Sequence, residues 1–217
     1  MEIDQSPTHL LKLQARKNFG SQMQSRPIPE KQDNPSFQKT RMNMENRWLT
    51  SAWQAGAWRH WLTDRGSLTR RLQQVGPDFR VLRLKQSLDR PNLDECGTLG
   101  LLPGRLAMIR EVLLLNADSP LVFAHSVIPL TGLSGPWAGL TGLGNRPLGA
   151  ALFSNPRVQR QALEYQHLDR HHSLYRNAVR HLDAPPRTLW ARRSLFALRN
   201  HPILVTEVFL PATLHLS

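Results

Sequence analysis

The chain has 217 residues, a net charge of +12 and a single cysteine, Cys96. This length suits one domain with a core of its own, and one cysteine excludes both an internal disulfide and a metal site built from several cysteines. No apolar run approaches the roughly 18 residues that cross a bilayer, and the N-terminus lacks the apolar core of a signal peptide, so we expect a cytoplasmic protein with no stable membrane insertion.

The positive charge alone does not define a partner. Lysines and arginines are scattered along the whole chain, whereas nucleic-acid-binding proteins usually gather them on one helix or arm. We therefore expect no nucleic-acid partner, and the charge fits a small polyanionic substrate or a merely basic surface. Cys96 has no catalytic motif around it, which favours a small semi-buried residue over a nucleophile.

The N-terminal part differs in composition from the rest. Residues 1–45 are polar, rich in Gln, Asn, Ser and Pro, and show no sustained apolar period. Such a segment cannot bury enough apolar surface to fold alone. We expect a disordered leader over residues 1–45 and a single folded domain over residues 46–217.

Two short helices are predicted at the start of this domain. Trp53, Ala57 and Trp61 recur at helical spacing and form an apolar stripe with Trp58 at its edge. This spacing favours packing over base stacking. Ser67 then stands where an N-cap residue opens a second helix.

Strands predominate in the remainder of the domain. Apolar runs bounded by turn residues predict strands over "FRVLRLKQ", "RLAMIREVLLLN", "PLVFAHSVIP", "LWARRSLFAL" and "HPILVTEVFLP". The turn-like Arg199 and Asn200 join the last two, and a helix is predicted to begin near Pro147. Because short turns join neighbouring strands, we predict the α+β class, with an antiparallel sheet and helices packed on it.

A fourth helix is predicted over residues 160–183. It contains His167 and His171 at i, i+4 spacing, which can bind zinc on a helix. Neither a carboxylate nor a cysteine motif supports a metal site, and the flanking arginines favour a solvated helix. We therefore predict no metal here.

Two charged residues stand alone in apolar strand faces. Alternation places Glu207 between Val205 and Phe209 in the last strand, and Arg110 between Met108 and Val112 in an earlier one. A guanidinium does not lose its proton, so a buried arginine needs an anion. One interpretation is that Arg110 and Glu207 pair with each other across the sheet; the other is that both face a ligand.

The two predicted helix starts favour a ligand. The backbone N–H groups of Leu68, after Ser67, and of Leu148, after Pro147, belong to first turns whose donors lack partners within the helix. Such N-termini receive anions readily. Together with one arginine and one carboxylate, they suit a small ring that carries a carboxylate at one end and a hydroxyl at the other.

From Trp58 to Ala212 the chain resembles the chorismate lyase family of bacterial enzymes. The resemblance rests on six blocks in the family's order: "GSLTRRL", "IREVLL", "VIPLTGLSGP", "LGNRPLGAALF", "LWARRSLF" and "ILVTEVFLPA". It implies a six-stranded antiparallel sheet with helical flaps that enclose an internal ligand pocket. By matching positions, it implies that Arg110 binds the substrate carboxylate, that Glu207 meets the hydroxyl, and that Leu68 and Leu148 lend backbone N–H groups.

The resemblance also implies a reaction. Chorismate lyase eliminates pyruvate from chorismate to give 4-hydroxybenzoate, the precursor of the ubiquinone ring, without a redox cofactor or metal, and the family leans toward monomers. Arg110 would orient the ring carboxylate. Glu207 would either accept a hydrogen bond from the hydroxyl or transfer the proton, and the sequence leaves these roles open.

One departure and one rival function accompany the resemblance. His125 stands where the family is expected to show arginine. One interpretation is that this position meets a second carboxylate of the substrate, in which case Arg192 or Arg193 would supply the positive charge that a neutral histidine lacks. The other is that His125 is an ordinary pocket-edge or surface residue. The rival is a non-catalytic ligand-sensing domain of the same fold, as some transcription regulators carry behind a winged helix. The leader lacks a helix-turn-helix pattern and is too short for that module.

Overall fold

The described residues 47–216 of the computed structural model form a seven-stranded sheet that is antiparallel throughout. Its order is β1-β2-β3-β7-β6-β4, and β5 pairs with the same edge of β6 as β4 does. The strands are β1 (Phe79–Asp89), β2 (Ala107–Asn116), β3 (Ser119–Pro129), β4 (Gln159–Arg160), β5 (Glu164–Asp169), β6 (Thr188–Leu198) and β7 (His201–Phe209). The predicted α+β class is confirmed, and the two-residue β4 adds a seventh strand to the expected six.

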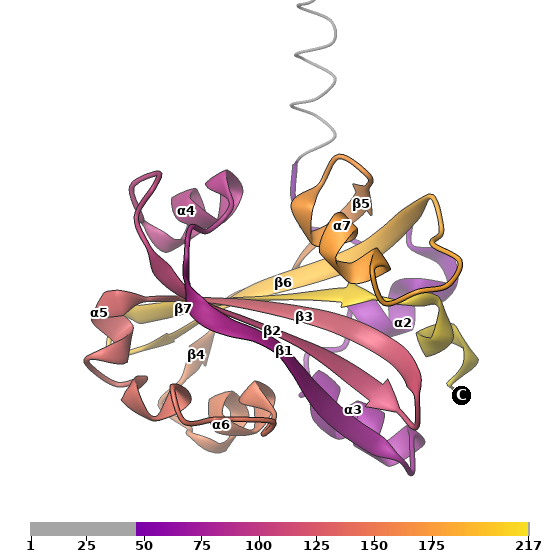
Figure 1. Ribbon diagram of the computed structural model, residues 1–217, viewed down its shortest axis with the longest axis horizontal. Coiled ribbons are helices and arrows are strands. Elements are labelled where there is room, and N and C mark those ends of the chain that lie inside the picture. Colours follow the sequence, from indigo (N-terminus) through magenta and orange to yellow (C-terminus); the bar gives the residue numbers. More distant parts are fainter. Residues whose placement is uncertain (1–46, 217) are drawn as a thin grey trace, which may run out of the picture. The chain divides into compact units, whose positions relative to one another are not determined.

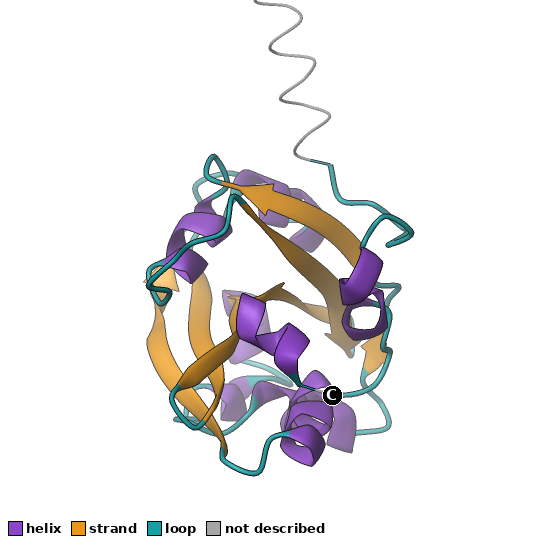
Figure 2. Cartoon of the chain, turned by 90° about the vertical axis from the view of Figure 1, so that its right-hand side faces the viewer, coloured by secondary structure: helices purple, strands orange, loops and turns teal. Residues whose placement is uncertain are grey.

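Helices cover both faces of the sheet. They are η1 (Gly56–Trp58), α2 (Arg59–Leu62), α3 (Leu68–Val75), α4 (Leu93–Leu99), α5 (Leu130–Leu133), η2 (Ala138–Leu140), α6 (Leu148–Ser154), α7 (Ser173–Val179) and η3 (Pro211–His215). Figure 1 shows α3 and α6 on one side of the sheet and α4 and α7 on the other. Figure 2 shows the strands curving between these helices. No helix within residues 47–216 is long and apolar enough to cross a membrane.

The central strands are apolar because both of their faces are covered. In β2, the side chains of Val112 and Leu114 enter the core under α3, whereas Leu113 and Leu115 enter the core under α7. Burying both faces of the middle strands stabilises the sheet by about 25 cal/mol for each Å² of apolar surface removed from water. Strand β1 lies at the edge, and its burial is accordingly incomplete.

The predicted hairpin between β6 and β7 is confirmed. Arg199 and Asn200 both have positive φ, 50° and 63°, and Leu198 pairs with His201 directly across the turn. Two consecutive residues in the left-handed region match the right-handed twist of the flanking strands. This turn fixes the register that places Arg192 beside Glu207.

The predicted helix over residues 160–183 is wrong for its first half. Residues 164–169 form β5, which pairs along β6, and the helix α7 begins only at Ser173. The open edge of β6 offers backbone hydrogen-bond partners, and this tertiary pairing overrides the local helical pattern. His167 therefore lies in a strand and His171 in a turn, so the i, i+4 zinc geometry does not exist.

The tryptophan stripe is confirmed only in part. Trp61 is 1% exposed in the core and Trp58 packs against that core, but Trp53 is 70% exposed. Gly56 has a φ of +52°, which interrupts any continuous helix from Trp53 to Trp61. The disordered leader predicted over residues 1–45 lies outside the described residues.

Candidate active site

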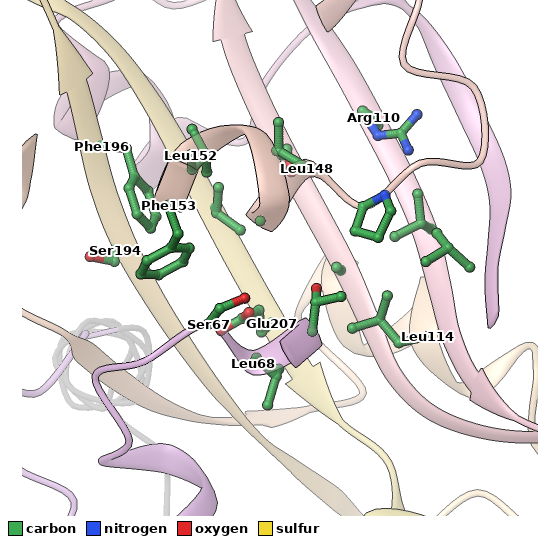
Figure 3. A pocket seen from close by; sticks show the side chains of 18 of the residues that line it. Ser67, Leu68, Arg110, Leu114, Leu148, Leu152, Phe153, Ser194, Phe196 and Glu207 are labelled. Atoms are coloured by element: carbon green, nitrogen blue, oxygen red, sulfur yellow. The ribbon is translucent and has the colours of Figure 1, made fainter. Parts of the chain in front are cut away.

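A pocket lies between the sheet and the first turns of α3 and α6. It holds about 650 Å³ of space free of protein atoms, part of it open to solvent. Figure 3 shows apolar side chains of both helices and of the sheet around it. Its lining comprises Gly66, Ser67, Leu68, Thr69, Val81, Arg110, Val112, Leu114, Ala124, Ser126, Pro147, Leu148, Gly149, Leu152, Phe153, Arg160, Ser194, Phe196, Val205 and Glu207.

The two helices meet at their N-terminal ends. The Ser67 hydroxyl accepts a hydrogen bond from the Arg70 backbone N–H at 3.3 Å, so Ser67 caps α3 as predicted. Pro147 is the N-cap residue of α6, so the helix begins at Leu148, one position after the predicted start. A side chain at Gly149 would place its Cβ 3.3 Å from Thr69 Oγ1. The two helix starts are therefore in close contact over the pocket.

Arg110 is buried in the pocket wall without a carboxylate partner. The residue is 2% exposed, and its guanidinium donates to Gln86 Oε1 at 2.8 Å and to the Arg146 carbonyl at 3.1 Å. Burial lowers its pKa, and the nearby charge of Arg83 lowers it further. Since no acidic side chain within residues 47–216 forms an ion pair with Arg110, the pocket wall carries a buried charge that an anionic ligand would neutralise.

Glu207 forms an ion pair, but its partner is Arg192. Arg192 Nε lies 2.5 Å from Glu207 Oε2, and Arg192 Nη1 donates to the backbone carbonyls of Trp61 and Asp64 at 2.8 and 2.7 Å. Arg192 is 1% exposed and does not line the pocket. It therefore holds one oxygen of Glu207 in place and leaves Oε1 for a ligand.

The structure brings all four predicted site residues to this one pocket. Arg110, Glu207, Leu68 and Leu148 all line it, and Leu68 and Leu148 are the first residues of α3 and α6. Arg110 and Glu207 do not pair with each other, because β3 lies between β2 and β7. Figure 3 shows the two side chains separated across the pocket.

His125 is not part of this pocket. It lies on the opposite face of the sheet, where Nε2 is 3.2 Å from Glu95 Oε1 and Nδ1 is 3.1 Å from Glu111 Oε1. Burial lowers the pKa of His125, but the two carboxylates outweigh burial and raise it to about 9. Both expectations for His125, a substrate ligand or an ordinary pocket-edge or surface residue, are therefore wrong.

Arg192 and Arg193, the two alternatives to His125 as a positive charge for the substrate, do not supply an unpaired charge either. Arg192 is engaged by Glu207. Arg193 lies on the face opposite the pocket and pairs with Asp94 at 2.9 Å and Glu164 at 2.7 Å. Cys96, predicted as a small semi-buried residue, is fully buried in α4.

Sequence reasoning missed Arg160, and it named Arg192 only as a replacement charge for His125, without placing it beside Glu207. Arg192 could have been recognised, because alternation along "WARRSLF" places it on the same strand face as Ser194 and Phe196. Arg160 could not, because it belongs to the two-residue β4 inside the segment predicted as a helix. The short strand that carries Arg160 forms only through its pairing with β6.

Together the fold and the site define an α+β protein with a small-molecule pocket beneath two helix N-termini. The family model described as chorismate lyase matches residues 45–216. A "Probable chorismate pyruvate-lyase" of Thiobacillus denitrificans is 51% identical over 168 residues, which cover 77% of this chain and 90% of that protein. A protein of the same description from Methylobacillus flagellatus is 46% identical over 173 residues, 80% of this chain and 97% of the relative. The chain therefore belongs to the chorismate lyase family.

Two solved structures show a distant likeness to this chain. The C-terminal domain of the histidine utilization repressor of Pseudomonas syringae is 7% identical with a TM-score of 0.49, covering 62% of this chain and 93% of that one. The effector domain of PhnF from Mycobacterium smegmatis is 14% identical with a TM-score of 0.48, covering 68% and 90%. Likeness at this level carries no conclusion about the function of this chain.

Proposed function

We propose that the protein is a chorismate pyruvate-lyase that converts chorismate to 4-hydroxybenzoate and pyruvate. Family membership supports this proposal. The observation that carries it is the buried Arg110, which has no carboxylate partner in the described part of the chain and shares a pocket with Glu207. A ring with a carboxylate at one end and a hydroxyl at the other satisfies both groups.

The chemistry suits a pocket of this kind. The C3–O ether bond of chorismate breaks, the hydrogen at C4 leaves as a proton, and the methylene carbon of the enolpyruvyl group gains a proton to give pyruvate. The remaining ring becomes aromatic, which drives the reaction, and no electrons are exchanged with another molecule. The protein must therefore orient the substrate, exclude water and guide one proton.

Each pocket group has a role in this proposal. Arg110 binds the ring carboxylate through the guanidinium N–H groups that do not donate to Gln86 Oε1 or to the Arg146 carbonyl. The backbone N–H groups of Leu68 and Leu148 are further donors to the ligand. Glu207 Oε1 accepts a hydrogen bond from the C4 hydroxyl or takes part in the proton transfer.

Pyruvate release tests the proposal. The purified chain is mixed with chorismate, and pyruvate is followed through NADH oxidation by a coupled lactate dehydrogenase. We expect release of pyruvate and 4-hydroxybenzoate in equal amounts, and a rate lower by about 10²-fold or more for Arg110→Met. If the chain binds 4-hydroxybenzoate, keeps its circular dichroism spectrum and releases no pyruvate, the protein is a ligand-sensing domain.

We further propose the family's role in ubiquinone biosynthesis, in the cytoplasm and as a monomer, with residues 46–217 as the catalytic domain. Deletion of residues 1–45 is then expected to leave kcat and KM within about twofold of the full chain, since the pocket lies entirely within the matched region. A large loss of activity on deletion would assign the leader a part in catalysis.

A further inference from the structure

The charges around the pocket do not balance. Two arginines, Arg110 and Arg160, line it together with one acid, Glu207. The carboxylate of Glu207 is already paired with Arg192, which lies behind the lining. Neither lining arginine forms an ion pair with any acidic side chain in residues 47–216. The pocket therefore has a surplus of two positive charges, which matches a ligand with two negative ones.

The guanidinium of Arg160 is held firmly. Its Nε donates to Ser194 Oγ at 3.2 Å and its Nη1 to the Arg65 carbonyl at 2.6 Å. The rings of Phe153 and Phe196 lie 5.4 and 5.1 Å from the guanidinium carbon. No hydrogen bond from Nη2 is seen in the described residues. A fixed, planar guanidinium with one free nitrogen is well prepared to bind a carboxylate.

Arg160 lies at the Glu207 end of the pocket. Its partner Ser194 is two positions along β6 from Arg192, which pairs with Glu207 across the β6–β7 ladder. Arg110 lies on β2, and strands β3 and β7 separate it from β6. Burial lowers the pKa of Arg160 and the charge of Glu207 opposes that effect, which agrees with their proximity.

The geometry of chorismate matches this arrangement. Its ring carboxylate is on C1, its hydroxyl is on C4 at the opposite end, and the enolpyruvyl group is on C3, beside the hydroxyl. When the C1 carboxylate binds Arg110 and the C4 hydroxyl meets Glu207, the enolpyruvyl carboxylate extends next to Glu207. We propose that Arg160 binds the enolpyruvyl carboxylate and makes the pocket specific for the dianionic substrate over its monoanionic product. This inference rests on the proposed function.

The test compares the affinity for a ligand with two carboxylates and for a ligand with one. Arg160→Met, Arg110→Met and wild type are compared by kcat/KM for chorismate and by the calorimetric Kd for 4-hydroxybenzoate. The exposed Arg157→Met serves as control, because Arg157 lies in the loop just before β4 and outside the pocket lining. We expect Arg160→Met to lower kcat/KM for chorismate by about 10²-fold, because the enolpyruvyl carboxylate loses its partner, and to leave the Kd for 4-hydroxybenzoate within about threefold of wild type. Arg110→Met should lower kcat/KM for chorismate and also weaken the binding of 4-hydroxybenzoate.

The product affinity also reports the integrity of the pocket. Arg160 contacts the Arg65 carbonyl just before α3, so a displaced α3 would weaken 4-hydroxybenzoate binding as well. Equal losses for both ligands, or kcat/KM within about threefold of wild type, would overturn the role of Arg160. Partial recovery in Arg160→Lys would support a charge contact. Absence of pyruvate release from wild type would instead contradict the proposed function on which this inference rests.

Discussion

The buried His125, on the sheet face opposite the pocket, should make the free energy of unfolding depend on pH. His125 lies between Glu95 and Glu111, at 3.2 and 3.1 Å, and its pKa is raised to about 9 from the ordinary value of 6.5. The folded state therefore binds a proton more tightly than the unfolded state does. The difference corresponds to at most about 3 kcal/mol of the free energy of unfolding.

The sign follows from the raised pKa. This contribution is fully present below about pH 6.5 and is lost as the pH rises through about 9. Glu95 and Glu111 behave in the opposite sense: burial raises the pKa of each, but the charge of His125 and hydrogen bonds from His125 and from neighbouring Asn side chains together lower it below the ordinary value. Their contribution is present above about pH 4.5 and is lost as the pH falls below that value. The cluster is therefore expected to stabilise the fold most at about pH 5 to 6.5.

Urea denaturation at a series of pH values measures this effect. Wild type should lose stability between pH 6.5 and 9, and His125→Gln should be less stable at pH 6 by about 3 kcal/mol, with little further loss as the pH rises. The exposed His215→Gln serves as control for histidine removal and should follow the wild-type curve. Parallel pH profiles for wild type and His125→Gln would refute the reasoning, because the difference between them isolates the proton on His125.

Three further results are expected at the pocket. Glu207→Gln should lower kcat by about 10²-fold or more if Glu207 transfers the proton, because an amide cannot take it up, and by less than about tenfold if Glu207 only positions the substrate. Gly149→Ala should weaken 4-hydroxybenzoate binding by about fivefold, measured by calorimetry, because its Cβ would press on Thr69; Gly139→Ala, with no atom within 4 Å of its Cβ, should not. A saturating concentration of 4-hydroxybenzoate should raise the melting temperature of wild type and leave that of Arg110→Met unchanged.

The strands that carry the pocket could be predicted from the sequence. In β2 and β7, alternation along each strand picked out Arg110 and Glu207 as charges within an apolar face, and both line the pocket. The helix starts at Ser67 and Pro147 could be predicted from capping chemistry. These features depend on nearest neighbours along the chain, which the sequence displays directly.

Features set by partners far along the chain could not be predicted in this way. The segment Glu164–Asp169 forms a strand because it pairs with the open edge of β6, and the β6–β7 register places Arg192 beside Glu207.

Helix α4 is a different case, because its limits are set by local residues. Asn92 and Glu95 form a capping box, in which the Asn92 N–H donates to Glu95 Oε2 at 2.8 Å, and Gly100 ends the helix in the left-handed region. That signal was present in the sequence and was overlooked.

A crystal structure of the protein with bound 4-hydroxybenzoate tests the central claim most directly. We expect the ring in the pocket beneath α3 and α6, its carboxylate within hydrogen-bond distance of the Arg110 guanidinium and its hydroxyl within the same reach of Glu207 Oε1. A ligand found outside this pocket, or one inside it that contacts neither Arg110 nor Glu207, would contradict the account.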